Sequence, residues 1–154
     1  MPASKLRKFL DDHGVKYVSI RHSPAFTAQE VAQSAHVSGR DFAKTIVVST
    51  ENGMALVVLP ASRRIVMSDL REMLLVPHVR LASEQEFRDL FPDCELGAMP
   101  PFGNLYGLPV YVAESLAAEK EIAFNAGTHT EVIKMRYEDF EALAKPVVLD
   151  FITT

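Results

Sequence analysis

The sequence has one cysteine, Cys94, and therefore cannot form an internal disulfide, as is typical of proteins in a reducing compartment. A single cysteine also cannot build a zinc site of the cysteine-rich type. The five histidines show no paired metal-binding spacing such as His-x-x-x-His. We therefore expect no metal at the functional site.

Long hydrophobic segments are missing as well. The longest apolar run covers residues 54–60, far short of the roughly 20 residues that cross a bilayer. The N-terminal residues lack the apolar region of a signal peptide. These features predict a cytoplasmic protein with no membrane partner.

Several enzyme fingerprints are absent. The chain has no G-x-S-x-G elbow of a serine hydrolase, no Walker loop and no dinucleotide-binding glycine pattern. The net charge is −4, so the molecule as a whole does not attract nucleic acid, and such a partner needs a local basic patch. We expect no NTP, no NAD and no other cofactor.

The composition is that of an ordinary folded domain, with 48% hydrophobic and 23% charged residues. A length of 154 residues fits one core, and so a single domain over residues 1–154. Spacing predicts helices over about 3–13, 28–36 and 137–144, and a capping box at Thr27–Glu30 opens the second of them. Ser68 is expected to be the N-cap of a helix that extends to about residue 75, and a second capping box, Ser83–Glu86, opens another helix. Strands are predicted over 15–20, 42–50, 54–59, 79–82, 109–113, 121–126 and 130–135. The predicted helices and strands do not alternate as regular βαβ units. This order indicates an α+β fold with a mixed, mostly antiparallel sheet flanked by helices.

The pair Asn52-Gly53 predicts a hairpin between two of these strands. With both residues in the turn, the register places Lys44 opposite Ala61 and near Arg63 and Arg64. The second strand is apolar without alternation, so we expect both of its faces to be covered.

The segment 95–109 holds three glycines and three prolines, which excludes a helix or a central strand. Its apolar residues, Met99 and Phe102 among them, favour a loop that packs as a wall or lid; the alternative is a long connection between sheet segments. Cys94 precedes this loop and is either a nucleophile or a small buried hydrophobic residue.

Lys44 lies in an otherwise apolar strand. It either extends to the rim or is held for an anionic or carbonyl partner. Arg40, Arg63 and Arg64 are near the same end of the strand, where they could bind phosphates or simply be solvated.

Three short motifs occur in a fixed order along the chain. They are Phe42-Ala43-Lys44-Thr45, Gly97-Ala98-Met99-Pro100-Pro101 and Phe124-Asn125-Ala126-Gly127-Thr128-His129. As a set they resemble the YbaK/ProX family of aminoacyl-tRNA deacylases, which is similar to the editing insertion domain of bacterial prolyl-tRNA synthetase. The resemblance extends from the first predicted helix to about residue 145 and implies the YbaK-like fold.

The resemblance implies a free-standing, metal-independent trans-editing enzyme that hydrolyses the ester of a mischarged tRNA with a small amino acid. In it, Lys44 holds the 3′ end or the ester, and backbone groups of the Gly97 loop position the carbonyl or the attacking water. His129 is a general base, a 2′-hydroxyl contact or a polar hairpin residue. Thr45 stands where alanine-removing members tend to have asparagine.

The expected catalytic residues are thus Lys44, Gly97 and His129. Substrate binding is expected at Phe26, Thr45, Ile46, Ala98, Met99, Pro100, Gly127 and Thr128, and tRNA contact at Arg40, Arg63 and Arg64. We expect Phe26 and Ile46 to face the Met99-Pro100 wall, so that bulky side chains are excluded.

Two functions remain open at this point. The first is the deacylase, with the 3′-CCA end of a mischarged tRNA and an aminoacyl-tRNA synthetase as expected partners. The second is a non-catalytic module that binds an amino acid or aminoacyl-tRNA in the same pocket.

Overall fold

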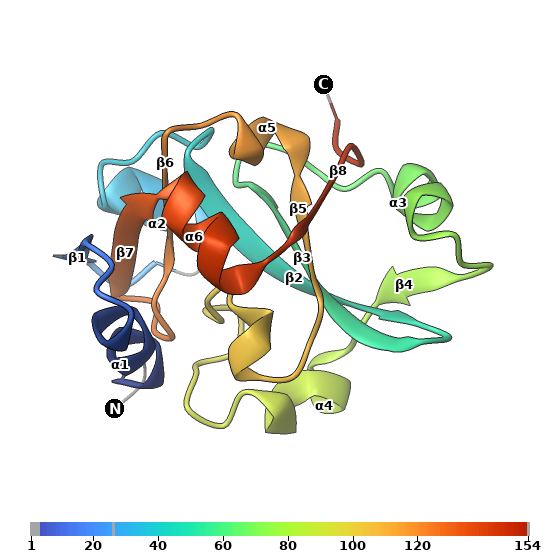
Figure 1. Cartoon of the computed structure of the whole chain (residues 1–154), viewed down its shortest axis with the longest axis horizontal. Helices are drawn as coiled ribbons and strands as arrows, with labels where there is room; N and C mark the ends of the chain where they lie inside the picture. Colours follow the sequence, from blue (N-terminus) through green and yellow to red (C-terminus); the bar gives the residue numbers. More distant parts are fainter. Residues whose placement is uncertain (1–3, 26, 154) are drawn as a thin grey trace.

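The computed structural model describes residues 4–25 and 27–153, so the expected substrate-binding residue Phe26 lies outside the described residues. Within them, the chain forms an eight-stranded sheet covered by helices (Figure 1). The strand order is β1-β7-β6-β2-β3-β5-β8, and β4 pairs with β2 off this path.

The elements have the following bounds. The strands are β1 (Tyr17–Arg21), β2 (Phe42–Thr50), β3 (Gly53–Pro60), β4 (Val79–Leu81), β5 (Val110–Ala113), β6 (Glu121–Asn125), β7 (Glu131–Arg136) and β8 (Val147–Leu149). The α-helices are α1 (Ser4–Asp12), α2 (Ala28–Ser34), α3 (Met67–Leu74), α4 (Glu84–Phe87), α5 (Glu114–Ala117) and α6 (Tyr137–Ala144), and two short 3₁₀ helices are η1 (Arg88–Leu90) and η2 (Gly103–Leu105). None of the helices in the described part of the chain has the length and hydropathy of a membrane span.

The sheet is mixed, as predicted. The β1–β7, β2–β3, β2–β4 and β6–β7 pairs are antiparallel, whereas the β2–β6, β3–β5 and β5–β8 pairs are parallel. The α+β class with a mostly antiparallel sheet in a single domain is therefore confirmed.

Three apolar clusters form the core. The α6 cluster includes Leu10, Phe102 and Phe140, the α2 cluster includes Val31 and Phe42, and the α3 cluster includes Leu70 and Val57. Along β3, Leu56 and Val58 belong to the α6 cluster, while Val57 and Leu59 belong to the α3 cluster. Successive side chains of a strand point to opposite faces, so both faces of β3 are covered, as its apolar run predicts.

The β2–β3 hairpin is confirmed, but its predicted register is wrong by two residues. Thr50 pairs with Gly53, and Lys44 pairs with Leu59 instead of Ala61. The reason is local: the Thr50 hydroxyl donates to the Gly53 carbonyl at 3.1 Å and accepts from the amide two residues on at 3.1 Å. These bonds close the turn before Gly53, which joins the strand.

Capping residues begin two of the helices as predicted. The Thr27 side chain accepts a hydrogen bond from the Glu30 amide at the start of α2. Ser83 and Glu86 form a reciprocal capping box at the start of α4. Each cap satisfies a backbone donor that has no partner inside the helix.

Two helix predictions need correction. The N-cap of α3 is Val66, whose amide donates to the Phe151 carbonyl at 2.7 Å, so Ser68 lies inside the first turn and caps nothing. Helix α4 ends at Phe87 and continues as the 3₁₀ helix η1, where we had expected one longer helix. The sequence also did not predict α5 and β8.

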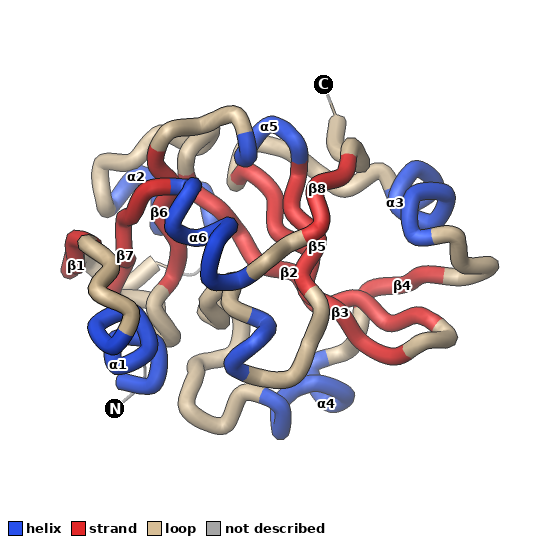
Figure 2. The backbone as a smooth tube through the Cα atoms, in the orientation of Figure 1, coloured by secondary structure: helices blue, strands red, loops and turns tan. Residues whose placement is uncertain are grey.

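The loop 95–109 packs against the body of the protein, as predicted. In Figure 2 it belongs to the mostly tan connection between α4 and β5. Met99 and Phe102 expose 4% and 0% of their surface and belong to the α6 cluster. The glycines and prolines exclude a regular α-helix, but the loop does contain the single 3₁₀ turn η2.

Substitution of Gly103 tests this packing. Gly103→Ala should lower the free energy of unfolding by about 1 to 3 kcal/mol, because the new Cβ would lie 2.7 Å from Val110 Cγ2 and overlap the Leu108 carbonyl oxygen. The exposed neighbour supplies the control, since Asn104→Ala should change stability by less than about 0.5 kcal/mol. Urea unfolding measures both; equal midpoints for the two variants would contradict the packing described.

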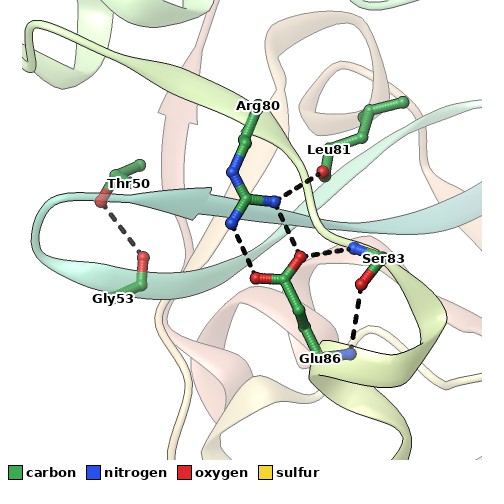
Figure 3. A network of polar contacts seen from close by, with 6 residues as sticks. All are labelled: Thr50, Gly53, Arg80, Leu81, Ser83 and Glu86. Atoms are coloured by element: carbon green, nitrogen blue, oxygen red, sulfur yellow. Dashed lines mark hydrogen bonds and ion pairs between the residues drawn. The ribbon is translucent and has the colours of Figure 1, made fainter.

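A charged network holds the start of α4 against β4 (Figure 3). Two Arg80 nitrogens donate to the two Glu86 carboxylate oxygens at 2.7 Å each. The same carboxylate accepts from the Ser83 amide at 2.9 Å. These bonds lower the pKa of Glu86 from its usual 4.5 to about 2, and the bond from Arg80 has the largest effect.

Glu86→Gln should lower the midpoint of thermal unfolding at pH 6 and lose this effect toward pH 2. The lowered pKa fixes the sign: ionised Glu86 stabilises the folded protein above the unfolded-state pKa, and this stabilisation fades as the pH falls from about 4.5 to about 2. Calorimetry of both proteins across this range measures the difference. A difference that stays constant from pH 6 to pH 2.5 would overturn the assignment, and the exposed Gln85→Ala variant should show no pH-dependent difference.

Candidate functional site

The sheet has a gap along one edge of β2. Among the described residues, β6 pairs with β2 at Phe42 and Ala43 alone, and β4 pairs with it at 48–50. Strand β3 occupies the other edge over 43–50. Residues 44–46 therefore face neither β6 nor β4, so the sheet is open where the expected site residues Lys44, Thr45 and Ile46 lie.

Lys44 is held at this gap. Its side chain is half-buried, and Nζ donates to the Ala61 carbonyl at 3.5 Å. Burial, and then the charge of Arg64, lowers the pKa of Lys44. Lys44 is thus partly removed from water and is affected by a second cation. An anionic or ester oxygen beside it would stabilise its charged form.

The expected tRNA-contacting arginines cluster by backbone contact. The Ser62 amide donates to the Gly39 carbonyl at 3.4 Å, which brings Arg40 and Arg63, their next neighbours in the chain, onto adjoining turns. Arg64 is exposed, and its charge contributes to lowering the pKa of Lys44. A local basic patch therefore borders Lys44 on a molecule of negative net charge.

The Gly97 loop is bonded to the turn that follows β6. The Glu95 amide donates to the Gly127 carbonyl at 2.8 Å, and the Gly127 amide donates to the Ala98 carbonyl at 2.9 Å. Between them, the Ala98 amide donates to the Glu95 carbonyl at 3.1 Å. The structure thus brings together three expected residues, Gly97, Ala98 and Gly127.

His129 lies beside Gly97. A Cβ built on Gly97 would sit 3.5 Å from His129 Nε2. Gly97 has φ +85°, a conformation that favours glycine, and it is exposed. The exposed glycine backbone and the imidazole therefore share one surface, with Thr128 next in the chain.

Glu95 is a site residue that the sequence analysis missed. Its Oε1 accepts from the His129 amide at 2.9 Å, and its Oε2 lies 3.7 Å from His129 Nδ1. The carboxylate thus holds the backbone of His129 and lies near its ring. Its only sequence signal is its place at the start of the glycine-rich loop.

The predicted wall differs from expectation. Ala98, Met99 and Pro100 are buried behind Gly97, and Met99 belongs to the α6 cluster. Ile46 packs with the α3 cluster on the other face of the sheet, so the prediction that it faces Met99 is wrong. Alternation along β2 explains this result, because it directs Thr45 toward the α6 side and both Lys44 and Ile46 to the opposite face.

Two buried polar atoms at the gap have no hydrogen-bond partner among the described residues, Thr45 Oγ1 and Asn125 Oδ1. Asn125 ends β6 directly after Phe124, which pairs with Ala43. Such atoms are rare in folded proteins and often mark functional sites. The sequence analysis expected Thr45 at the site but did not include Asn125. The feature that could have indicated Asn125 is a polar residue at the end of an apolar strand.

Cys94 is a protonated thiol at neutral pH. Burial raises its pKa to about 11, and Sγ lies 3.3 Å from the Tyr106 hydroxyl. A nucleophilic cysteine acts as the thiolate, so the structure favours the alternative that Cys94 packs and hydrogen-bonds beneath the loop.

A separate cavity of about 290 Å³ lies at the tip of the β2–β3 hairpin, between Thr50, Leu74 and Leu108. Its lining has no histidine, lysine, arginine or carboxylate, and its titratable side chain is that of Tyr111. Over the part of the chain that the structure describes, no group of three His, Cys, Asp or Glu is placed to hold a metal ion.

Comparison with known proteins gives one family match. The sequence model of a family described as an aminoacyl-tRNA editing domain matches residues 22–143. The chain is also 28% identical over 153 residues to the multifunctional Ser/Thr-tRNA deacylase ProXp-y of Escherichia coli K12, covering 96% of this chain and 90% of that protein.

Solved structures agree with this match. A protein described as a candidate trans-editing enzyme for prolyl tRNA synthetase superposes with a TM-score of 0.84 at 25% identity, over 99% of this chain and 98% of that chain. The hypothetical protein APE2540 superposes with a TM-score of 0.86 at 22% identity, over 97% and 100% of the two chains. At that identity, the second likeness bears on the fold alone.

Truncation of Glu95 should loosen the turn that carries His129. Glu95→Ala should speed hydrogen exchange of the His129 amide about tenfold, because a hydrogen bond to a charged group contributes on the order of 1.5 kcal/mol. Glu95→Gln keeps an acceptor oxygen and should retain most of the protection. NMR measures the hydrogen-exchange rate of the His129 amide in each protein. Identical rates in the wild type and both variants would show that Glu95 does not hold the turn.

Proposed function

The chain belongs to the aminoacyl-tRNA editing domain family, and on this premise we propose that it is a free-standing deacylase, which hydrolyses the ester between a small amino acid and a mischarged tRNA. In this proposal, the editing domain spans residues 1–154 and acts in the cytoplasm. The observation that carries the proposal is the Gly97 loop bonded to the 127–129 turn, at the sheet gap that Lys44 borders.

Lys44 binds the 3′ end of the tRNA in this reaction. Its lowered pKa reflects lost solvation, which an oxygen of the terminal nucleotide or of the ester would partly restore. The exposed side chains of Arg40 and Arg64, together with half-buried Arg63, supply charge for phosphates nearby.

Gly97 positions the ester carbonyl. Its left-handed backbone and its lack of a side chain let a substrate approach the main chain closely. Backbone donors in a rigid turn stabilise the negative charge that develops on a carbonyl oxygen. The bonds to Gly127 supply the rigidity that such a site requires.

His129 accepts the proton of the attacking water. The water oxygen adds to the ester carbonyl carbon, the bond to the ribose 3′ oxygen breaks, and that oxygen takes the proton from His129 as the amino acid leaves. The alternative role for His129 is a contact with the 2′-hydroxyl. A tRNA ending in 2′-deoxyadenosine separates the two roles, because only the second loses its partner.

The acyl side chain meets a limited space. Ala98, Met99 and Pro100 are buried behind Gly97, and Thr45 and Thr128 supply polar groups near the same backbone. A stiff wall of this kind rejects larger side chains by overlap. Esters of alanine, serine, threonine or cysteine are therefore the proposed substrates.

A synthetase partner fits the charge of the molecule. The net charge of −4 weakens general attraction to tRNA, and the local arginine patch counters this effect. We expect an aminoacyl-tRNA synthetase to hold or release the tRNA whose 3′-CCA end enters the site.

A deacylation screen tests the function. Purified protein should hydrolyse mischarged tRNAs that carry small amino acids and spare phenylalanyl-tRNA. Equal cleavage of alanyl- and phenylalanyl-tRNA would overturn the size filter. Binding of charged tRNA without hydrolysis of any ester would overturn the enzyme and support the binding module instead.

Lys44→Met should abolish deacylation, with a loss of at least about 100-fold in kcat/KM, and should not lower the unfolding midpoint. The folded environment already disfavours the charged amine, so its removal relieves a cost. Lys134→Met, on β7 and paired at 3.8 Å with Glu121, is the control and should keep full activity. An active Lys44→Met protein would show that the site is placed wrongly.

A further inference from the structure

The ring of His129 lies between Gly97 and a carboxylate. Its Nε2 is 3.5 Å from the position of a Cβ built on Gly97, and its Nδ1 is 3.7 Å from Glu95 Oε2. The two nitrogens of an imidazole occupy different edges of the ring. The Nε2 edge therefore faces the glycine backbone, and the Nδ1 edge faces Glu95.

Three hydrogen bonds hold Glu95 in this place. Its amide donates to the Gly127 carbonyl at 2.8 Å, and its carbonyl accepts from the Ala98 amide at 3.1 Å. Its Oε1 accepts from the His129 amide at 2.9 Å. Because the first carboxylate oxygen binds the backbone of His129, the second one lies beside the ring of the same residue.

The two side chains differ in their contact with water. The His129 side chain exposes 11% of its surface, and the Glu95 side chain exposes 47%. An imidazole that takes up a proton becomes a cation. A cation that is removed from water is costly unless an opposite charge faces it. Glu95 can supply this charge and keep much of its own hydration.

The separation of the two groups suits a contact that strengthens during the reaction. At 3.7 Å, Nδ1 and Oε2 are within the range of an ion pair but farther apart than in a hydrogen bond. The attraction is weak while the ring is neutral and grows when the ring becomes charged. An interaction that is stronger in the transition state than in the ground state accelerates the chemical step.

We infer that Glu95 is a positioning residue of the deacylation reaction. It keeps the proton of neutral His129 on Nδ1, so that Nε2 is the nitrogen that removes a proton from the attacking water. It then faces the imidazolium until the Nε2 proton passes to the ribose 3′ oxygen, and Glu95 itself neither gains nor loses a proton. The inference rests on the proposed function, in which His129 is the general base.

A glutamine at this position separates the inference from a purely structural role. Glu95→Gln keeps an acceptor oxygen for the His129 amide, so the turn should stay in place. Its NH₂ group carries no charge and donates to Nδ1, which moves the ring proton to Nε2. The nitrogen that faces Gly97 is then a donor and cannot accept the proton of water.

NMR of the imidazole nitrogens tests this inference without any substrate. At alkaline pH, their ¹⁵N chemical shifts show which nitrogen of the neutral ring carries the proton. We expect Nδ1 in the wild type and Nε2 in Glu95→Gln, with exchange of the His129 amide close to the wild-type rate. Glu51→Gln removes an exposed carboxylate from the hairpin turn; it is the matched control and should leave the proton on Nδ1.

Kinetics supply the second arm. With a mischarged tRNA, Glu95→Gln should lower kcat at least about 100-fold and change KM by less than about threefold. The reason is that the position of the ring proton affects the chemical step and not the binding of the substrate. Glu51→Gln should keep the wild-type kcat.

Two outcomes would overturn the inference. One is a neutral wild-type ring protonated on Nε2, a measurement that stands even if Glu95→Gln loosens the turn. The other is a Glu95→Gln protein with the wild-type kcat or the wild-type ring proton. Failure of the proposed function is distinct from both: no ester would be hydrolysed, while NMR would still find the proton on Nδ1 in the wild type and on Nε2 in Glu95→Gln.

Discussion

Two backbone hydrogen bonds to Gly127 hold the loop 95–109, and the rest of the candidate site depends on them. One connects Gly127 to Glu95 and the other to Ala98, so Gly97 is fixed between them. Gly127 follows β6, whose pairing with β2 places the same turn beside the gap at Lys44. The sheet therefore sets the distance between the lysine and the glycine turn, and a rigid scaffold carries a site made of loops.

The sequence predicted local features well and distant contacts poorly. Helix α6 has the predicted limits because Tyr137–Ala144 carries its own spacing and is followed by Lys145 in the left-handed conformation and by Pro146. The hairpin was located correctly, but the Thr50 hydroxyl moved its turn and so its register. The parallel pairing of β2 with β6 joins segments about 80 residues apart, and no local pattern encodes it.

The same division applies to the site. The resemblance of three short motifs to a known family pointed to Lys44, Gly97 and His129, and these three remain predictions. Glu95 was missed because a carboxylate at a loop start looks solvated, and only the folded chain shows it bound to the His129 amide. Ile46 was misplaced because strand alternation, set by the sheet, directs it to the α3 cluster.

The central claim is that Lys44, the Gly97 loop and the 127–129 turn form one reaction site. A crystal structure with a non-hydrolysable substrate analogue, an adenosine whose 3′ oxygen is replaced by an amide link to alanine, tests it most directly. The account predicts the amide carbonyl against Gly97 and the ribose beside Lys44. An analogue bound in the hairpin-tip cavity near Thr50 and Leu74, with the Lys44 gap empty, would contradict it.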